Sequence, residues 1–260
     1  MEEKKVLFHL EQHIATITLN RTNALNALDN DMISDIIHYL KGCNNNDEVR
    51  VMVIKGNGKA FCSGDDLVDM GTKDHPNPSN KFTEYIQGYP EIVKAIWDLE
   101  KPVITQVHKY ALGAGFEIAL ASDFIIASEE SKFGLPFVLR GLAAGTYLLP
   151  KMIGYHQAAK ILFTGEMITV NELESYGLLY RITTSEELNN EVSLLAEKLA
   201  NSATRSISLM KRAMHNSADL ALHEAMDMQA LSTFASFYTD DYQEGIQAFV
   251  EKREPNFKGK

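Results

Sequence analysis

The sequence predicts an α/β fold that ends in a region made only of helices. In the first two-thirds of the 260 residues, short runs rich in β-branched residues alternate with segments of helical periodicity. The clearest strands are residues 49–55, 103–107 and 124–127. From residue 185 to residue 252 the apolar residues are spaced as in amphipathic helices. We therefore expect a β/α body and a helical tail that either folds over the body or packs against other subunits.

The chain begins with a predicted β-hairpin. Residues 6–10 and 13–19 alternate apolar and polar side chains, as strands with one buried face do. Residues 21–28 are expected to form a loop. Asp29 has the short acceptor side chain of a helix N-cap, and we expect Gly42 to end the helix that follows.

The middle of the chain contains helices separated by turn residues. Residues 71–80 are rich in Pro, Asn and Gly, which predicts a loop. Residues 82–99 have an amphipathic pattern, and Pro90 within it predicts a break near Gly88. Residues 131–145 are expected to be a loop with turns, followed by short helices at 146–152 and 156–163.

The last part of the chain is predicted to be helical after one short strand. Thr169 is expected to cap a helix that reaches residue 176, and residues 178–182 are expected to form the strand. The helical segments that follow are 187–201, 204–216, 219–238 and 240–251. We interpret the methionines of these segments as core residues, namely Met210, Met214, Met226 and Met228.

Composition excludes several classes of function. The net charge of −10 argues against a general nucleic-acid binder. Cys43 and Cys62 are too few for a disulfide framework, which fits a reducing compartment. No apolar run reaches membrane-spanning length, the N-terminus has no apolar signal segment, and Cys and His show no metal-ligand spacing. We expect a cytoplasmic protein with no metal and no nucleic-acid or membrane partner.

Residues 101–123 combine a buried strand, a tight turn and an apolar helix. Gly113 and Gly115 let backbone approach a ligand without a Cβ atom in between. Glu117 is the one charged residue at the start of this apolar helix, and burying a carboxylate is costly unless it is bonded, protonated or used. It is either a structural carboxylate at a helix N-terminus or a general acid/base beside a substrate oxygen.

A second turn of small residues, 60–66, also follows a strand. Ligands of such sheets gather at the ends of strands. One backbone N–H from each of the two turns could point at a single oxygen, as the enolate of a thioester requires. Neither turn has the glycine pattern of a phosphate-binding loop or of a dinucleotide site.

These motifs occur in an order that resembles the enoyl-CoA hydratase/isomerase (crotonase) superfamily over essentially the whole chain. The resemblance rests on residues 21–28 (RTNALNAL), 60–67 (AFCSGDDL), 101–123 (KPVITQVHKYALGAGFEIALASD), 133–136 (FGLP) and 251–260 (EKREPNFKGK). It implies a crotonase (ClpP-like) spiral of ββα units at residues 1–195 and a helical oligomerisation region at 196–260. The assembly that it implies is a homotrimer or a dimer of trimers.

The resemblance also implies a site. The substrate would be an acyl-CoA thioester, with coenzyme A as part of the substrate and no separate cofactor. Glu117 falls at the position of the family's first catalytic glutamate, and the oxyanion donors match the backbone N–H groups of Ser63 and Ala114. The residues that match the substrate and CoA groove are Ala24, Ala60, Ser63, Asp65, Asp66, Leu67, Ala114, Pro136 and Phe137.

Phe137 departs from the family pattern. Hydratases of the family carry a second glutamate at this position, and an aromatic ring cannot hold or deprotonate water. Asp65, Arg140 and Tyr147 are the nearby polar residues that could assist. Three hypotheses follow: a hydratase or double-bond isomerase that uses Glu117, an acyl-CoA decarboxylase of the same family, or an acyl-CoA-binding protein without turnover.

Overall fold

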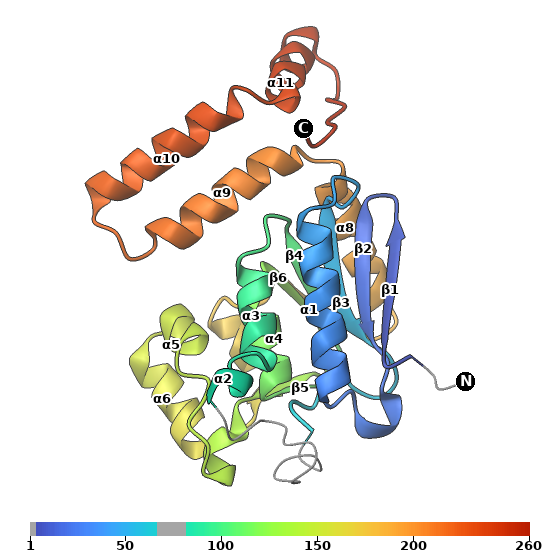
Figure 1. The fold of residues 1–260 in the computed structure, drawn as a ribbon, viewed down its shortest axis with the longest axis vertical. Coiled ribbons are helices and arrows are strands. Elements are labelled where there is room, and N and C mark those ends of the chain that lie inside the picture. The colour runs from blue at the N-terminus through green and yellow to red at the C-terminus, as the bar shows by residue number, and fades with distance from the viewer. Residues whose placement is uncertain (1–3, 67–81) are drawn as a thin grey trace.

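The computed structural model describes residues 4–66 and 82–260 (Figure 1). In this part of the chain the larger sheet has the strand order β1-β2-β3-β4-β6-β9. Strand β1 is antiparallel to β2, and the other neighbours are parallel. The strands are β1 (Val6–Glu11), β2 (Ile14–Leu19), β3 (Val51–Gly56), β4 (Val103–Val107), β6 (Phe124–Ser128) and β9 (Arg181–Thr183). The predicted hairpin and the three clearest strands are confirmed.

A smaller sheet lies beside the first and carries part of the site. Its order is β5-β7-β8, with β5 (Tyr110–Leu112), β7 (Lys132–Gly134) and β8 (Ile168–Thr169). The prediction of loop for residues 131–145 was wrong for β7 and for the 3₁₀ helix η2 (Pro136–Arg140). Both elements are too short for their periodicity to be read from the sequence.

Both faces of the central strand β3 are buried because helices cover them. On β3, Met52 and Ile54 belong to the core that includes α1 (Asn30–Asn44), α3 (Tyr89–Trp97) and α4 (Ala114–Ala121). Val51 and Val53 point to the opposite face and pack with α8 (Leu188–Ala200). This alternation explains why the strand reads as a continuous apolar run in the sequence.

Helix α1 begins as predicted but ends later. The side chain of Asp29 accepts a hydrogen bond from Met32 N at 3.0 Å, as expected of an N-cap. The prediction that Gly42 ends the helix was wrong, because α1 continues to Asn44. The burial of Leu40 and Cys43 in the core favours continuation, and it outweighs the cost of about 1 kcal/mol for a glycine within a helix.

The predicted break near Gly88 is confirmed. Helix α2 (Phe82–Tyr85) stops before Gly88, and α3 starts at Tyr89 with Pro90 in its first turn. The predicted loop at residues 71–80 lies outside the described residues.

The remaining short helices of the body follow the prediction closely. Thr169 caps its helix through a reciprocal pair of hydrogen bonds with Glu172, as predicted. The strand expected at 178–182 is shorter and shifted, since β9 begins at Arg181. The helices are α5 (Leu148–Ile153), α6 (Tyr155–Thr164) and α7 (Val170–Ser175).

The C-terminal helices are confirmed, and α8 and α9 (Thr204–Ser217) contact the body, α9 through Lys211 Nζ to Asp123 Oδ2 at 2.7 Å. Helices α9 and α10 (Leu222–Ser236) form a hairpin that projects beyond the sheets, followed by α11 (Asp240–Glu251) (Figure 1). The division expected between residues 195 and 196 lies within α8 and stays a prediction.

The interpretation of the C-terminal methionines as core was wrong for the isolated chain. Met210, Met214 and Met226 are 55%, 70% and 49% exposed. They line a groove of about 540 Å³ between α9 and α10. An apolar spacing alone does not distinguish a core from a surface that awaits a partner.

Replacing Gly42 with alanine is expected to stabilise the protein. The residue is exposed within α1, and an added Cβ would meet no atom within 4 Å. The Gly42→Ala variant should therefore be about 0.5–1 kcal/mol more stable in denaturant unfolding. Gly115→Ala is the matched control and should lose stability, because its Cβ would lie 2.6 Å from Cys62 Cβ. A loss of stability in Gly42→Ala would contradict the placement of this glycine in a regular helix.

Candidate active site

The two small-residue turns of the sequence lie side by side, backbone against backbone. Cys62 N donates to Tyr110 O at 3.0 Å, and Leu112 N donates to Cys62 O at 3.0 Å. These hydrogen bonds align the first turn with β5, which leads directly into Gly113 and α4. The two turns therefore lie at one place in the fold, and their joint role in a site stays a prediction.

Glycine is required at the contact because backbone atoms leave no room for a side chain. Gly64 has φ +100°, and a Cβ there would lie 2.9 Å from Leu112 O and 3.6 Å from Ala114 N. Gly113 has φ +51° and forms the N-cap of α4. These left-handed conformations are readily adopted only by glycine, so both turns depend on it.

The backbone N–H groups at the contact correct one prediction. Ser63 N donates to Leu25 O at 3.1 Å, so the N–H group of Ser63 is not available as an oxyanion donor. Among the described residues, the N–H groups of Asp65 and Ala114 donate to no protein acceptor. Ala114 is the first residue of α4, where the N–H groups have no partner within the helix.

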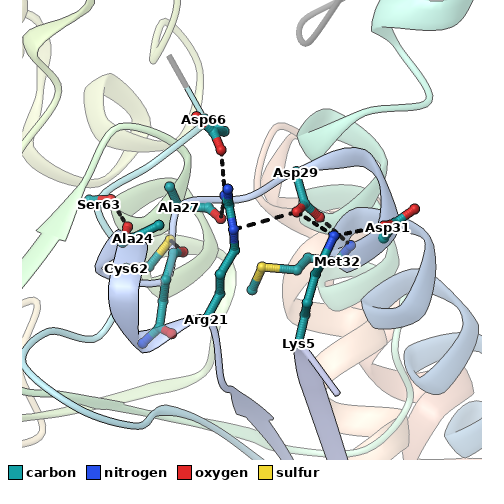
Figure 2. Close-up of polar contacts among 11 residues, drawn as sticks. Lys5, Arg21, Ala24, Ala27, Asp29, Asp31, Met32, Cys62, Ser63 and Asp66 are labelled. Carbon is teal, nitrogen blue, oxygen red and sulfur yellow. Dashed lines mark hydrogen bonds and ion pairs between the residues drawn. The ribbon is translucent and has the colours of Figure 1, made fainter. Parts of the chain in front are cut away.

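A network of charged side chains fixes the end of the first turn at Asp66 (Figure 2). Arg21 pairs with Asp66 through Nη1, and its Nε lies 3.6 Å from Asp29 Oδ2. Lys5 Nζ reaches Asp29 and Asp31 at 2.8 and 2.7 Å. The carboxylate of Asp66 is 4% exposed and engaged with Arg21, which makes it a support of the turn.

Asn26 stabilises the first turn through hydrogen bonds, and the sequence did not predict a role for it. It is fully buried with φ +56°, and its Nδ2 donates to the carbonyls of Asn57, Ala60 and Phe61 at 2.9, 2.9 and 3.1 Å. An amide between the apolar Leu25 and Ala27 is the sequence signal that could have identified it. Asparagine tolerates the left-handed conformation and also supplies the donors.

Glu117 lies in a helix that is buried on all sides. It is 8% exposed, and its Oε2 has no hydrogen-bond partner. Burial raises the pKa of the Glu117 carboxyl to about 6, and the Tyr89 hydroxyl partly offsets that rise. Tyr89 is a second residue that the sequence did not single out. A carboxyl group with a pKa near neutrality is suited to both accepting and donating protons.

Asp65 supplies a second carboxyl group at the site; the residue is partly buried, and its Oδ1 atom is buried. Its Oδ1 has no hydrogen-bond partner. Burial and the nearby charge of Glu117 raise the pKa of Asp65 to about 7. The two carboxyl groups therefore influence each other across the contact between the turns.

A small cavity of about 70 Å³ opens at this contact. Of the predicted residues, Ser63, Asp65, Pro136 and Phe137 line it, as does Arg140. The remaining lining residues are Gly64, Leu112, Gly113 and Leu142. The cavity thus combines both turns with η2, three segments that are far apart in the sequence.

Other predicted residues lie beside the cavity or away from it. The carbonyl of Ala24 accepts a hydrogen bond from Ser63 Oγ at 3.4 Å. Ala60 is fully buried, and its carbonyl accepts a hydrogen bond from Asn26 Nδ2. Tyr147 is 60% exposed and contacts Lys151, so it does not join the cavity lining. Leu67 lies outside the described residues.

Phe137 forms an apolar wall of the site. It is 9% exposed and stacks on Tyr89 with ring centroids 6.4 Å apart and an interplanar angle of 14°. A Cβ on Gly113 would lie 3.6 Å from its ring. Phe137 therefore lies between Gly113 and Tyr89, the residue whose hydroxyl lowers the pKa of Glu117.

Residues 4–66 and 82–260 contain neither a cluster of metal ligands nor a helix that could span a membrane. No group of three or more His, Cys, Asp and Glu residues there could hold a metal ion. No helix in that part of the chain is both long and apolar enough to cross a bilayer. A larger cleft of about 700 Å³, lined by Lys55, Lys59 and His108 among others, contains neither Glu117 nor Asp65.

The fold, with two glycine turns in backbone contact beside the carboxyl groups of Asp65 and Glu117, is of the crotonase type. A sequence profile described as enoyl-CoA hydratase/isomerase matches residues 9–260. The chain belongs to the enoyl-CoA hydratase/isomerase family.

Individual relatives include both isomerases and hydratases. The chain is 31% identical over 259 residues to the 1,2-epoxyphenylacetyl-CoA isomerase of Escherichia coli K12, covering 98% of each chain. It is 31% identical over 264 residues to the crotonyl-CoA hydratase of Syntrophomonas wolfei, covering all of both. A solved enoyl-CoA hydratase subunit of Geobacillus kaustophilus superimposes with a TM-score of 0.90 at 33% identity over the full length of both chains.

Replacing Asn26 with alanine tests the role of this side chain as the support of the first turn. The change leaves three buried carbonyl groups without their donor and places alanine in a left-handed conformation. The free energy of unfolding should fall by about 2–3 kcal/mol, and thioester turnover should fall with it. Asn46→Ala, which removes one exposed hydrogen bond to Glu48 N, is the control. Equal stability of the two variants would contradict the assignment.

Proposed function

We propose that the protein converts an acyl-CoA thioester through an enolate. The thioester oxygen is held by the N–H groups of Asp65 and Ala114, and Glu117 transfers the proton. The observation that carries the proposal is the pair of unengaged N–H groups on either side of the contact between Gly64 and Gly113. Coenzyme A takes part only as a portion of the substrate.

The surroundings of the two N–H groups favour a negatively charged oxygen. Ala114 opens α4, so the positive end of the helix dipole adds to its N–H group. Both donors are held by glycine turns and need no rearrangement when charge develops on the oxygen. In a site that excludes water, the loss of one such donor typically costs about 100- to 1000-fold in rate.

The other groove residues support the substrate in different ways. Ser63, Pro136 and Phe137 line the cavity for the acyl group, and Ala24 lies next to Ser63. Ala60 and Asp66 act on the turn itself, because one is fully buried and the other pairs with Arg21. We retain Leu67 as a groove residue on the basis of family resemblance alone.

Double-bond isomerisation suits the site better than hydration. Isomerisation moves a proton between two carbons of the acyl chain and consumes no water. The wall that Phe137 and Tyr89 form offers an apolar surface where a hydratase of the family would place a second glutamate. The near-neutral pKa of Glu117 supports turnover and counts against a binding protein that has lost its chemistry.

A decarboxylase is the second candidate, and Arg140 favours it. This residue lines the cavity, and among the described residues it makes no ion pair. A guanidinium group at this place could receive a substrate carboxylate, and loss of CO₂ would then form the enolate directly. Release of CO₂ from a malonyl-type thioester would support this candidate over isomerisation.

We propose that the α9–α10 hairpin is the subunit interface of a homotrimer or a dimer of trimers. Its groove is lined by exposed methionines together with small residues. Burying such a surface between subunits would remove apolar area from water.

Replacing Glu117 with glutamine should abolish turnover and spare binding. The amide keeps the shape of the side chain but cannot accept a proton. Conversion of 3-hexenoyl-CoA to 2-hexenoyl-CoA, followed by enoyl thioester absorbance, should fall by at least about 100-fold. Calorimetric binding of the thioester should change little. Glu129→Gln, on an exposed turn, is the control. Full activity of Glu117→Gln would overturn the proposed role.

A further inference from the structure

We propose that Asp65 is a second catalytic carboxyl group, which acts with Glu117 in place of the glutamate that Phe137 replaces. The inference rests on the proposed function and makes it more specific. Glu117 takes a proton from one carbon of an enoyl thioester, and Asp65 gives a proton to another. The substrate class is accordingly a thioester with a double bond next to an acidic CH₂ group, such as a 3-enoyl-CoA.

The unsatisfied polar atoms of the described chain gather at this site. They are Asn26 Oδ1, Asp65 Oδ1 and Glu117 Oε2, all buried without a hydrogen-bond partner. Such atoms are rare in proteins, and each requires an explanation. Two of them are carboxyl oxygens on the two turns that meet here. A ligand between the turns would satisfy both.

The placement of Asp65 differs from that of the neighbouring Asp66. Asp65 lines the cavity with Gly113 and Phe137, whereas Asp66 is engaged with Arg21. Only Asp65 is thus available to a substrate. Its own N–H group is one of the two proposed oxyanion donors, so its carboxyl group lies near the thioester carbons.

The different pKa values of the two carboxyl groups assign one as the base and the other as the acid. The pKa of Asp65 is raised to about 7, mainly by burial, and that of Glu117 to about 6. At neutral pH Glu117 is therefore the more readily ionised of the two and acts as the base, while Asp65 retains a proton more often and acts as the acid. A protonated Asp65 also avoids placing a negative charge beside the enolate.

Other titratable and charged groups face this pair from several elements. The Tyr89 hydroxyl on α3 lowers the pKa of Glu117, and the buried thiol of Cys62 interacts with Asp65. Arg140 on η2 lines the cavity that Asp65 lines, and Glu117 lies outside that lining. Arg21 is occupied by Asp66. Burial raises the pKa of Cys62 to about 12, so this thiol is neutral in the working range.

The proton transfers balance as follows. Glu117 carboxylate removes a proton from C2 of a 3-enoyl thioester, and the C–H electron pair forms the C1–C2 double bond of a dienolate. Asp65 then protonates C4, the double bond moves to C2–C3, and the thioester carbonyl is restored. The cycle leaves Glu117 protonated and Asp65 ionised. Exchange of one proton with water returns both to their starting states.

The test separates removal of the C2 proton from delivery at C4. Asp65→Asn keeps the shape and the N–H group but cannot deliver a proton. With 3-hexenoyl-CoA, isomerisation should fall by at least about 100-fold. Exchange of the C2 hydrogens with deuterium in D₂O, followed by mass spectrometry, should persist because Glu117 still removes and returns that proton. Asp35→Asn, on the exposed face of α1, should behave as wild type.

The pH dependence supplies a second readout. Wild-type kcat/KM should rise with pH through about 6, as Glu117 ionises, and fall above about 7, as Asp65 loses its proton. A profile without the fall above neutrality would count against Asp65 even if the variant does not fold.

Three outcomes overturn an assignment. Wild-type isomerisation by Asp65→Asn would show that Asp65 is not the acid. Loss of both isomerisation and C2 exchange, with thioester binding intact, would make Asp65 a positioning residue instead. Absence of C2 exchange in the wild-type protein would refute the proposed function itself.

Discussion

The backbone contact between the first turn and β5 is the constraint on which the site depends. Two hydrogen bonds of Cys62, to Tyr110 and from Leu112, bring the first turn against the start of α4. The approach is so close that Gly64 and Gly115 cannot carry a side chain without a clash. Because the contact is made by main chain, it positions N–H groups and not side-chain rotamers, as the proposed site for a carbonyl oxygen requires.

The rest of the body maintains this contact from both sides. Asn26 bonds two carbonyl groups of the first turn and that of Asn57, and Arg21 secures the far end of the turn through Asp66. Helix α4 is buried all round, so its N-terminus cannot shift without disturbing the core. This arrangement lowers the stability of the free protein, because Asp65 and Glu117 each have a buried carboxyl oxygen without a partner in the protein. In our account substrate binding supplies the missing partners.

Much of the fold could be predicted from sequence, because strands, caps and helices leave local signals. The hairpin, the Asp29 cap and the break at Gly88 each depend on residues adjacent in the chain. The helix end predicted at Gly42 was wrong because the destabilising effect of one glycine is small beside the burial of Cys43. The core position predicted for the C-terminal methionines was wrong because periodicity gives the apolar face of a helix but not what covers that face.

The sequence predicted the segments of the candidate site, but the direction of each N–H group depends on contacts between distant residues. Glycine spacing and a lone charged residue pointed to the two turns and to Glu117. The choice between Ser63 and Asp65 as donor depends on where one N–H group points, and Leu25 takes that of Ser63. The roles of Tyr89 and Asn26 could not be predicted, because their partners lie more than twenty residues away along the sequence.

The carbonyl stretch of a bound enoyl thioester tests the central claim most directly. Infrared difference spectra of 2-hexenoyl-CoA labelled with ¹³C at C1 isolate this one vibration. Two hydrogen bonds from Asp65 and Ala114 should polarise the carbonyl group and move the band to lower wavenumber on binding. The shift should persist in Glu117→Gln, which leaves both N–H groups in place. A bound thioester whose carbonyl band stays at its position in water would contradict the oxyanion site.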